Sequence, residues 1–371
     1  MKALGIIFSN IYDSSLGQLT NHRTVASLPF GGRYRFIDFV LSNMSNSGIY
    51  NIGIITKYNY RSLMDHLGNL ADWDLNRKNE GVVFLPPFAS GNTGVYRGKL
   101  EALYSALQFI NNPAYDYVVV SDSTVLANID FKAAIRQHEL SGAEVTILAN
   151  REKKNAKRKH PLILKADKNN KVTGIMTDTT VKDDSYVGLG MFIFTREKLV
   201  AALEDANSRG FVHLERDYLQ KRFNDNEIKM SVYPVEGVVL RNEDIKSYFA
   251  NNMALLQKDV HEGLFKDDNP IYTKVRDEAP TYYAVGSKVK NCIMADGCKV
   301  YGTILDSIIF RDVAVAKEAE VKNSIIMQGA RIGEGAKLEY VILDKNVTVL
   351  PGTELKGSPE HPVIIQKGET A

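Results

Sequence analysis

One carboxylate in this sequence is placed for chemistry on phosphate groups. Asp122 follows closely on the apolar run Tyr117–Val120, so its side chain is expected at the C-terminal end of a buried strand. In open α/β sheets, ligands bind outside that end of the strands. A carboxylate there can hold Mg²⁺, which neutralises a transferring phosphoryl group. An aspartate that only caps a turn would look the same when considered alone.

A motif near the start of the chain bears on the same chemistry. Leu28–Ile49 reads LPFGGRYRFIDFVLSNMSNSGI. The stretch before it, Phe8–Leu16 (FSNIYDSSL), follows the first strand candidate and contains no glycine. Phosphate-binding loops at such a position use glycine because backbone amides must approach the phosphates closely. The sequence therefore combines a phosphate-site position with a loop that is unsuited to binding phosphate.

The elements that would position Asp122 alternate between strand and helix candidates. Short apolar runs typical of buried strands occur at Leu4–Ile7, Asn51–Thr56, Tyr117–Val120, Glu144–Leu148 and Met191–Phe194. Between them, Lys99–Ile110 has its apolar residues on one helical face, and Asp130 is placed to cap a helix over Phe131–Leu140. We expect an α/β fold with a doubly wound, mostly parallel, Rossmann-like sheet.

From about Ala284 the pattern changes to recurring Gly, Val, Ile and small polar residues without a helical period. Three segments can be aligned, Asp296–Leu305, Lys317–Ile326 and Glu334–Leu343, and their starts are 21 and 17 residues apart. This spacing is near three six-residue sides and predicts a left-handed parallel β-helix of hexapeptide repeats. The inward positions would be Val289, Val300, Val321 and Leu338. A β-sandwich of short strands is the alternative.

These patterns divide the chain into three parts. We assign residues 1–240 to the α/β domain, 241–283 to a helical connector and 284–371 to the β-helix domain. The connector prediction rests on Asp244–Asp267 (DIKSYFANNMALLQKDVHEGLFKD), which is typical of helix.

Composition argues against several other classes of protein. The 371 residues carry 46 basic and 44 acidic side chains, a net charge of +2, so nothing favours nucleic acid or a membrane surface as a partner. We interpret the one basic run, Arg151–His160, as a solvated loop. Cys292 and Cys298 are too few for a disulfide framework and lack the partners of a zinc site. Without a signal-peptide pattern or an apolar run of ~20 residues, a cytoplasmic location is expected.

Several segments together resemble one family, the bacterial ADP-glucose pyrophosphorylases, which are glucose-1-phosphate adenylyltransferases. Leu28–Ile49 is similar to the family signature PFGGKxRxIDFxLSNxxNSGI, and Tyr96–Gly98 to the start of its YRGTADA motif. Gly188–Phe194 resembles the family's MGIYVF strand, and Ser247–Leu256 its SYYEANMDLL helix. The resemblance implies a nucleotidyltransferase domain that joins ATP and glucose 1-phosphate into ADP-glucose and pyrophosphate with Mg²⁺. It also implies that the β-helix serves assembly.

The resemblance further implies roles for individual residues. Asp122 would be a retained but vestigial metal ligand, and Arg97 and Gly98 would bind substrate. Arg23 and Arg35 match arginines around the family's sugar-bisphosphate effector site, although nearby family lysines are replaced here. Surface salt bridging is the alternative for both arginines.

The departures from the family pattern fall on catalytic positions. Ser15 replaces the arginine of the GGxGTRL loop, and Val25 and Ala26 replace the KP pair. Lys57 replaces the glutamine of TQY, and Gly98–Ala102 (GKLEA) replaces GTADA. Thr179 replaces the lysine of FxEKP, and Asn242 replaces the second metal aspartate. Losing one catalytic group typically costs about 10²- to 10⁴-fold in rate. We therefore expect this chain to bind no cofactor firmly and to be inactive or very weakly active alone.

On these grounds the chain resembles the non-catalytic subunit that some bacteria pair with the active pyrophosphorylase subunit in glycogen synthesis. By that resemblance the assembly is a heterotetramer, Mg²⁺ belongs to the active partner, and a small phosphorylated molecule is the candidate effector. Two alternatives stay open. Glu243 or Asp244 could replace the missing aspartate in an active enzyme with a remodelled loop. A hexapeptide-repeat acyltransferase would need a histidine base, and none of the seven histidines lies between Val285 and Gly357.

Overall fold

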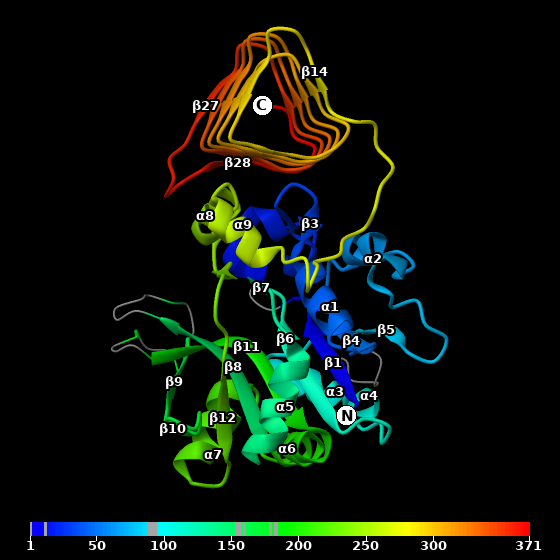
Figure 1. Ribbon diagram of the computed structural model, residues 1–371, viewed down its shortest axis with the longest axis vertical. Coiled ribbons are helices and arrows are strands. Elements are labelled where there is room, and N and C mark those ends of the chain that lie inside the picture. Colours follow the sequence, from blue (N-terminus) through cyan, green and yellow to red (C-terminus); the bar gives the residue numbers. More distant parts are fainter. Residues whose placement is uncertain are drawn as a thin grey trace.

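The computed structural model describes residues 2–10, 13–87, 95–152, 158, 161–177, 180–181 and 185–371. They form an α/β domain and a C-terminal coil of triangular cross-section, which Figure 1 shows end-on. Thr179 and most of the basic run Arg151–His160 lie outside the described residues. Within those described ranges, no helix is both long enough and apolar enough to cross a membrane.

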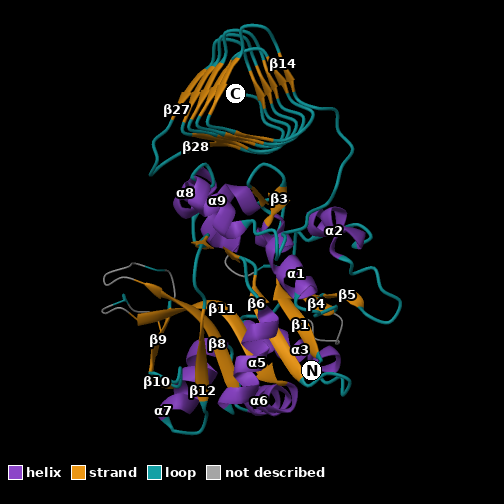
Figure 2. Ribbon diagram, in the orientation of Figure 1, coloured by secondary structure: helices purple, strands orange, loops and turns teal. Residues whose placement is uncertain are grey.

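A nine-stranded sheet lies at the centre of the first domain (Figure 2). Its strands are β1 (Ala3–Phe8), β4 (Asn51–Ile55), β5 (Gly81–Leu85), β6 (Tyr117–Asp122), β8 (Val145–Glu152), β9 (Leu162–Ala166), β10 (Val172–Thr177), β11 (Ser185–Thr195) and β12 (Met230–Pro234). The order is β10-β9-β11-β6-β1-β4-β5, with β8 between β11 and β12. The β6-β1-β4-β5 half and the β8-β12 pair are parallel, and β11 runs antiparallel to β6, β8 and β9. The predicted α/β fold is confirmed, and all five predicted strands are present.

Helices cover both faces of this sheet (Figure 2). The helices of the first domain are α1 (Phe36–Asn46), α2 (Arg61–Leu67), α3 (Lys99–Ser105), α4 (Leu107–Ile110), α5 (Phe131–Ser141), α6 (Arg196–Ser208) and α7 (Lys221–Asn224), with short 3-10 helices at Asp13–Thr20, Val25–Ser27 and Ala71–Trp73 and a π-helix at Leu214–Gln220. Alternate side chains of β1 point to opposite faces. Leu4 and Ile6 pack in the cluster that contains α3 and α6 residues, and Ile7 in the cluster that contains α1 and α5 residues.

Two helix predictions have different outcomes. The helix expected over Lys99–Ile110 is divided at Ala106 into α3 and α4. The cap predicted for α5 is confirmed, because Asp130 Oδ1 accepts a hydrogen bond from the Ala133 amide at 3.1 Å. Such an N-cap satisfies an amide that the first helical turn leaves without a partner.

The C-terminal domain is a left-handed β-helix of hexapeptide repeats, as predicted. One side is built from β14 (Tyr282–Tyr283), β17 (Lys299–Val300), β20 (Ala314–Val315), β23 (Arg331–Ile332) and β26 (Thr348–Val349). The second contains β15 (Lys288–Lys290), β18 (Thr303–Leu305), β21 (Glu320–Lys322), β24 (Lys337–Glu339) and β27 (Glu354–Lys356). The third contains β16 (Ile293–Met294), β19 (Ile308–Ile309), β22 (Ile325–Ile326), β25 (Val341–Leu343) and β28 (Val363–Ile365).

The predicted inward residues lie inside the coil, but one part of the predicted register is wrong. Val321 stacks on Leu338, as expected from their 17-residue spacing. Val300 does not stack on Val321, because Val300 pairs with Val315 on another side of the coil. Ile304 is the residue that pairs with Val321. Each coil has three inward rows, so aliphatic residues at similar spacing can belong to different sides of the triangle.

A third apolar cluster joins the two domains. It combines residues from the segment 16–39, from the connector helices α8 (Ile245–Ala254) and α9 (Lys258–Leu264), and from the third side of the β-helix. Arg23 crosses the same junction, and its Nη2 donates to Asp344 Oδ1 and Oδ2 at 2.7 and 2.8 Å. Both side chains are buried. The β-helix is thus held against the first domain by apolar contacts and by this ion pair.

A small ribbon positions the edge of the first domain's cleft. β7 (Val125–Ala127) directly follows Asp122 and pairs antiparallel with β13 (Val239–Arg241). This pairing brings Asn242 and Glu243, which follow β13, beside the end of β6. A second ribbon, β2 (Pro29–Phe30) with β3 (Tyr34–Arg35), lies at the domain junction.

Candidate functional site

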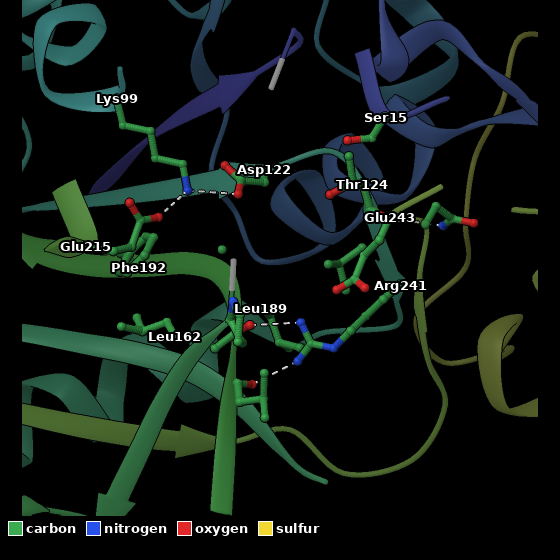
Figure 3. Close-up of a pocket in the computed structure, with 16 residues that line it drawn as sticks. Ser15, Lys99, Asp122, Thr124, Leu162, Leu189, Phe192, Glu215, Arg241 and Glu243 are labelled. Atoms are coloured by element: carbon green, nitrogen blue, oxygen red, sulfur yellow. Dashed lines mark hydrogen bonds and ion pairs between the residues drawn. The ribbon is translucent and has the colours of Figure 1, made fainter. Parts of the chain in front are cut away.

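The cleft predicted at the C-terminal end of β6 is present. Figure 3 shows its lining, which brings together Asp122 from β6, Ser15 from the remodelled loop, and Asn242 and Glu243 from the segment after β13. The space amounts to about 670 Å³, including the part open to solvent. The structure therefore places four sequence-predicted positions around one cleft.

A buried cation contacts Asp122. Lys99, the first residue of α3, places its Nζ 2.9 Å from Asp122 Oδ2 and 2.5 Å from Glu215 Oε1 (Figure 3). Lys99 and Asp122 are both buried. Burial raises the pKa of Asp122 to about 6, the Lys99 ammonium opposes this rise, and the Glu215 carboxylate adds to it. Asp122 Oδ1 is buried and has no hydrogen-bond partner in the described part of the chain.

Asn242 is held by the protein through both of its polar atoms. Its Nδ2 donates to the carbonyl of Thr124 at 3.0 Å and to that of Leu240 at 3.3 Å. Its Oδ1 accepts a hydrogen bond from Asn251 Nδ2 at 3.0 Å. The side chain is almost fully buried. This arrangement locks the amide into the junction between β7, β13 and α8.

The two acidic residues after Asn242 have separate positions. Asp244 caps α8, since its Oδ1 accepts a hydrogen bond from the Ser247 amide at 2.8 Å. Glu243 lines the cleft, and its Oε2 lies 4.0 Å from Arg158 Nη1. Asp244 is thus committed to a helix end. Glu243 is the carboxylate that reaches the cleft.

Arg241 also lines the cleft, and sequence reasoning did not select it. Its guanidinium donates to Glu152 Oε1 at 2.9 Å, to Asn150 Oδ1 at 2.6 Å and to the carbonyls of Gly188 and Val187 at 2.8 and 2.9 Å. Burial lowers the pKa of Arg241, while Glu152 raises it. Its place directly before Asn242, which replaces the second metal aspartate, was the signal available in the sequence. Its partners come from β8 and β11 and are brought to it only by the fold.

A second pocket of about 720 Å³, including the part open to solvent, shares Lys99 and Glu215 with the first. Its lining includes Lys57, Arg97 and Gly98 together with Phe8, Asn10, Ile55, Tyr96, Ala102 and His213. The exposed Arg97 pairs with Glu101, and its Nε donates to Glu101 Oε1 at 2.8 Å. Asn10 Oδ1 accepts a hydrogen bond from the Lys57 amide at 2.9 Å. Arg97 and Gly98, the substrate positions predicted from the resemblance, thus line this pocket together with Lys57. Asn10, a residue of the remodelled loop, lines it as well.

A basic pocket of about 400 Å³ lies at the domain junction. Six cationic side chains line it, which are Arg33, Arg35, Lys274, Arg276, Arg311 and Lys345. Burial and the neighbouring Arg35 and Arg23 hold the pKa of Lys345 well below its usual range. Burial likewise lowers the pKa of Arg35 to about 10. Arg311 Nε is buried without a hydrogen-bond partner among the described residues.

The two predicted effector arginines have different places. Arg35 lines the basic pocket, and its Nη1 donates to the Ser62 carbonyl at 2.7 Å. Arg23 does not line this pocket and is bound to Asp344 instead. Sequence reasoning missed the other five cations. Arg33 lies two residues before Arg35, whereas Lys274, Arg276, Arg311 and Lys345 come from three segments that are distant in the sequence. Val25, predicted as a lost lysine position, is fully buried in the junction cluster.

The described residues contain no group of three or more His, Cys, Asp or Glu side chains arranged to hold a metal ion. Mg²⁺ fits the cleft poorly, because the Lys99 ammonium lies on Asp122 Oδ2 and would repel an ion at the remaining oxygen Oδ1, and because Asn242 is bound by the protein. Firm Mg²⁺ binding requires charged oxygen ligands that are open to the ion.

A sheet with a cleft at the end of β6, followed by a hexapeptide β-helix, defines a nucleotidyl transferase architecture. Residues 6–233 match the family model described as nucleotidyl transferase, and residues 281–361 match the GlmU-like C-terminal hexapeptide model. The chain is 34% identical to the glycogen biosynthesis protein GlgD of Bacillus subtilis, with 99% of this chain and 96% of that protein covered. It is 36% identical to GlgD of Geobacillus stearothermophilus, with the same coverage.

A third relative is the glucose-1-phosphate adenylyltransferase of Fervidobacterium nodosum, which is 30% identical over 95% of this chain and 85% of its own length. The chain therefore belongs to the nucleotidyl transferase family, in the group that contains the GlgD proteins and the glucose-1-phosphate adenylyltransferases.

Proposed function

We propose that this chain is a subunit of a glucose-1-phosphate adenylyltransferase in glycogen biosynthesis, and that it regulates or stabilises a catalytic subunit without turning over substrate itself. The names of its relatives support the pathway. The observation that carries the catalytic deficiency is the state of the two metal positions. Asp122 is neutralised by Lys99, and Asn242 is bound through both polar atoms.

The remodelled loop supports the same proposal. In place of a glycine loop, the described residues show a 3-10 helix at Asp13–Thr20, and Ser15 from this helix faces the cleft. A serine supplies no positive charge to a triphosphate.

The basic pocket supports the regulatory part of the proposal. Six cations line the pocket at the junction between the domains, and they form a site for a small molecule with more than one phosphate group. Hydrogen bonds between a cationic donor and a phosphate are stronger than those between neutral groups. Arg33 and Arg35 come from the first domain, whereas Arg311 and Lys345 come from the β-helix. A bound anion would therefore tie the two domains together. In an assembly this coupling could change the activity of a partner subunit.

The direct test is pyrophosphate release from ATP and glucose 1-phosphate with Mg²⁺. We expect no measurable turnover by this chain alone. A mixture with a catalytic glucose-1-phosphate adenylyltransferase subunit should differ from the catalytic subunit alone in rate or effector response, and the two chains should co-elute as a heterotetramer. Robust turnover by this chain alone would contradict the proposal and would make Glu243 the replacement carboxylate. An unchanged mixture without co-elution would contradict the regulatory role.

A further inference from the structure

One ion pair lines both pockets of the first domain that are described above. The pocket that contains Asp122 and Asn242 and the pocket that contains Lys57 and Arg97 share two lining residues, Lys99 and Glu215. In a nucleotidyl transfer, two phosphorylated substrates must meet at one phosphorus atom. Lys99 and Glu215 are therefore placed where the two pockets adjoin.

The position of Lys99 is firmly determined. Its Nζ is bound by Asp122 Oδ2 at 2.9 Å and by Glu215 Oε1 at 2.5 Å, and it lies 5.4 Å from the centre of the Phe192 ring. Only 6% of the Lys99 residue is exposed. A buried ammonium is stable only when its charge is compensated, and here two carboxylates and an aromatic face compensate it.

The Lys99 ammonium lies on Asp122 Oδ2, and Oδ1 is the carboxylate oxygen without a hydrogen-bond partner among the described residues. A divalent ion on either oxygen would lie within a few ångströms of this ammonium and be repelled by it. In the sequence, Lys99 stands at the threonine position of the GTADA pattern. A threonine there would bring no charge to Asp122. The residue that differs from the family pattern, Lys99, is thus the one that brings a positive charge to Asp122.

We propose that Lys99 is a built-in cation that replaces the divalent ion at Asp122. This inference rests on the proposed function, since it explains how a non-catalytic chain keeps a buried carboxylate at its ancestral position. It attributes the loss of activity to the presence of Lys99, in addition to the replacement of the family's catalytic residues.

The test measures Mn²⁺ binding by the full chain, without nucleotide, sugar phosphate or partner. Free Mn²⁺ is followed by electron paramagnetic resonance, and the melting temperature is recorded with and without Mn²⁺. The wild-type chain should show no binding at Asp122. K99M, which keeps the length of the side chain and removes its charge, should bind Mn²⁺ at least tenfold more tightly. The double variant K99M/D122N should lose this gain.

Two further variants keep the test decisive. K99R is the matched control that retains a cation, and it should behave like the wild type. E215Q changes a partly exposed side chain and leaves the Lys99 ammonium on Asp122. It should therefore bind no Mn²⁺ at Asp122, and this result can be obtained even if K99M fails to fold. A folded K99M that gains no Mn²⁺ affinity would overturn the inference, and so would Mn²⁺ binding by E215Q that D122N removes. Because no turnover is measured, these outcomes are independent of the pyrophosphate-release test.

Discussion

Replacing Arg23 with alanine should lower the free energy of unfolding by about 3–5 kcal/mol. Arg23 and Asp344 are both buried at the domain junction, and the pair is bidentate at 2.7 and 2.8 Å. Removing the guanidinium leaves the Asp344 carboxylate buried without its main partner, and this desolvated charge is the physical cause of the loss. Since domains of this kind are stable by only about 5–15 kcal/mol, the effect should be large in a urea titration.

Two variants make this prediction specific. Arg331→Ala removes another arginine that contacts both carboxylate oxygens of an aspartate, Asp312, but on the exposed surface of the β-helix. Exposed pairs contribute about 0–1 kcal/mol, so this control should be nearly neutral. The double variant Arg23→Met, Asp344→Leu removes both charges and should be more stable than Arg23→Ala. A loss below about 1 kcal/mol for Arg23→Ala would show that the pair does not hold the junction.

Reversing one charge of the basic pocket should weaken anion binding by about 100-fold, since a charge-assisted hydrogen bond contributes about 1.5–3 kcal/mol. Arg276→Glu is the suitable change because Arg276 lines the pocket and is exposed to solvent, so the fold should tolerate it. Inorganic pyrophosphate is the probe, and titration calorimetry gives the dissociation constant. Lys290→Glu, a reversal at an exposed position of β15 outside the pocket, is the matched control. Equal affinities of Arg276→Glu and wild type would place anion binding elsewhere.

The same pocket predicts how binding depends on pH. Lys345 has a pKa held well below its usual range by burial and by Arg35 and Arg23. Below that depressed pKa the lysine is charged and attracts the anion fully, and above it the attraction weakens. Pyrophosphate affinity should therefore fall as pH rises through the depressed pKa. Without ligand, the stability of the fold depends on pH with the opposite sign. The unfolded chain keeps the proton on Lys345 up to about pH 10.4, whereas the folded chain releases it at the depressed pKa. Between these two pKa values, the contribution of Lys345 to the free energy of unfolding therefore increases with pH.

The architecture was predictable from the sequence because apolar patterning is local. The run Tyr117–Val120 and the position of Asp122 suffice to place a carboxylate at a sheet edge, and the α5 cap follows from one aspartate before a helix. The β-helix register was less predictable. Val300 and Val321 look equivalent in a linear pattern, but they belong to different sides of the triangle.

The site was predictable only where one motif contains the residues. Asn242 and Ser15 were identified as altered, and both line the cleft. The partner of Asp122 was not predicted, because Lys99 lies 23 positions before Asp122 on another element and only the fold brings the two together. Glu215, which binds the same ammonium, is 116 positions from Lys99. Of the six cations of the basic pocket, only Arg35 was predicted, and those from the connector and the β-helix were missed for the same reason. Charge clusters built from several segments leave no periodic signal in a sequence.

The apolar cluster at the domain junction has a consequence for how the molecule melts. Residues of the loop segment, of α8 and α9 and of the β-helix share one buried surface, so neither domain can unfold without exposing apolar side chains of the other. Scanning calorimetry should therefore show a single heat-absorption peak, with equal calorimetric and van't Hoff enthalpies, although two architectures are present. Two separate peaks would mean that the junction opens first. The chain is expected to behave as one cooperative unit, in which a ligand bound at the junction stabilises both folds at once.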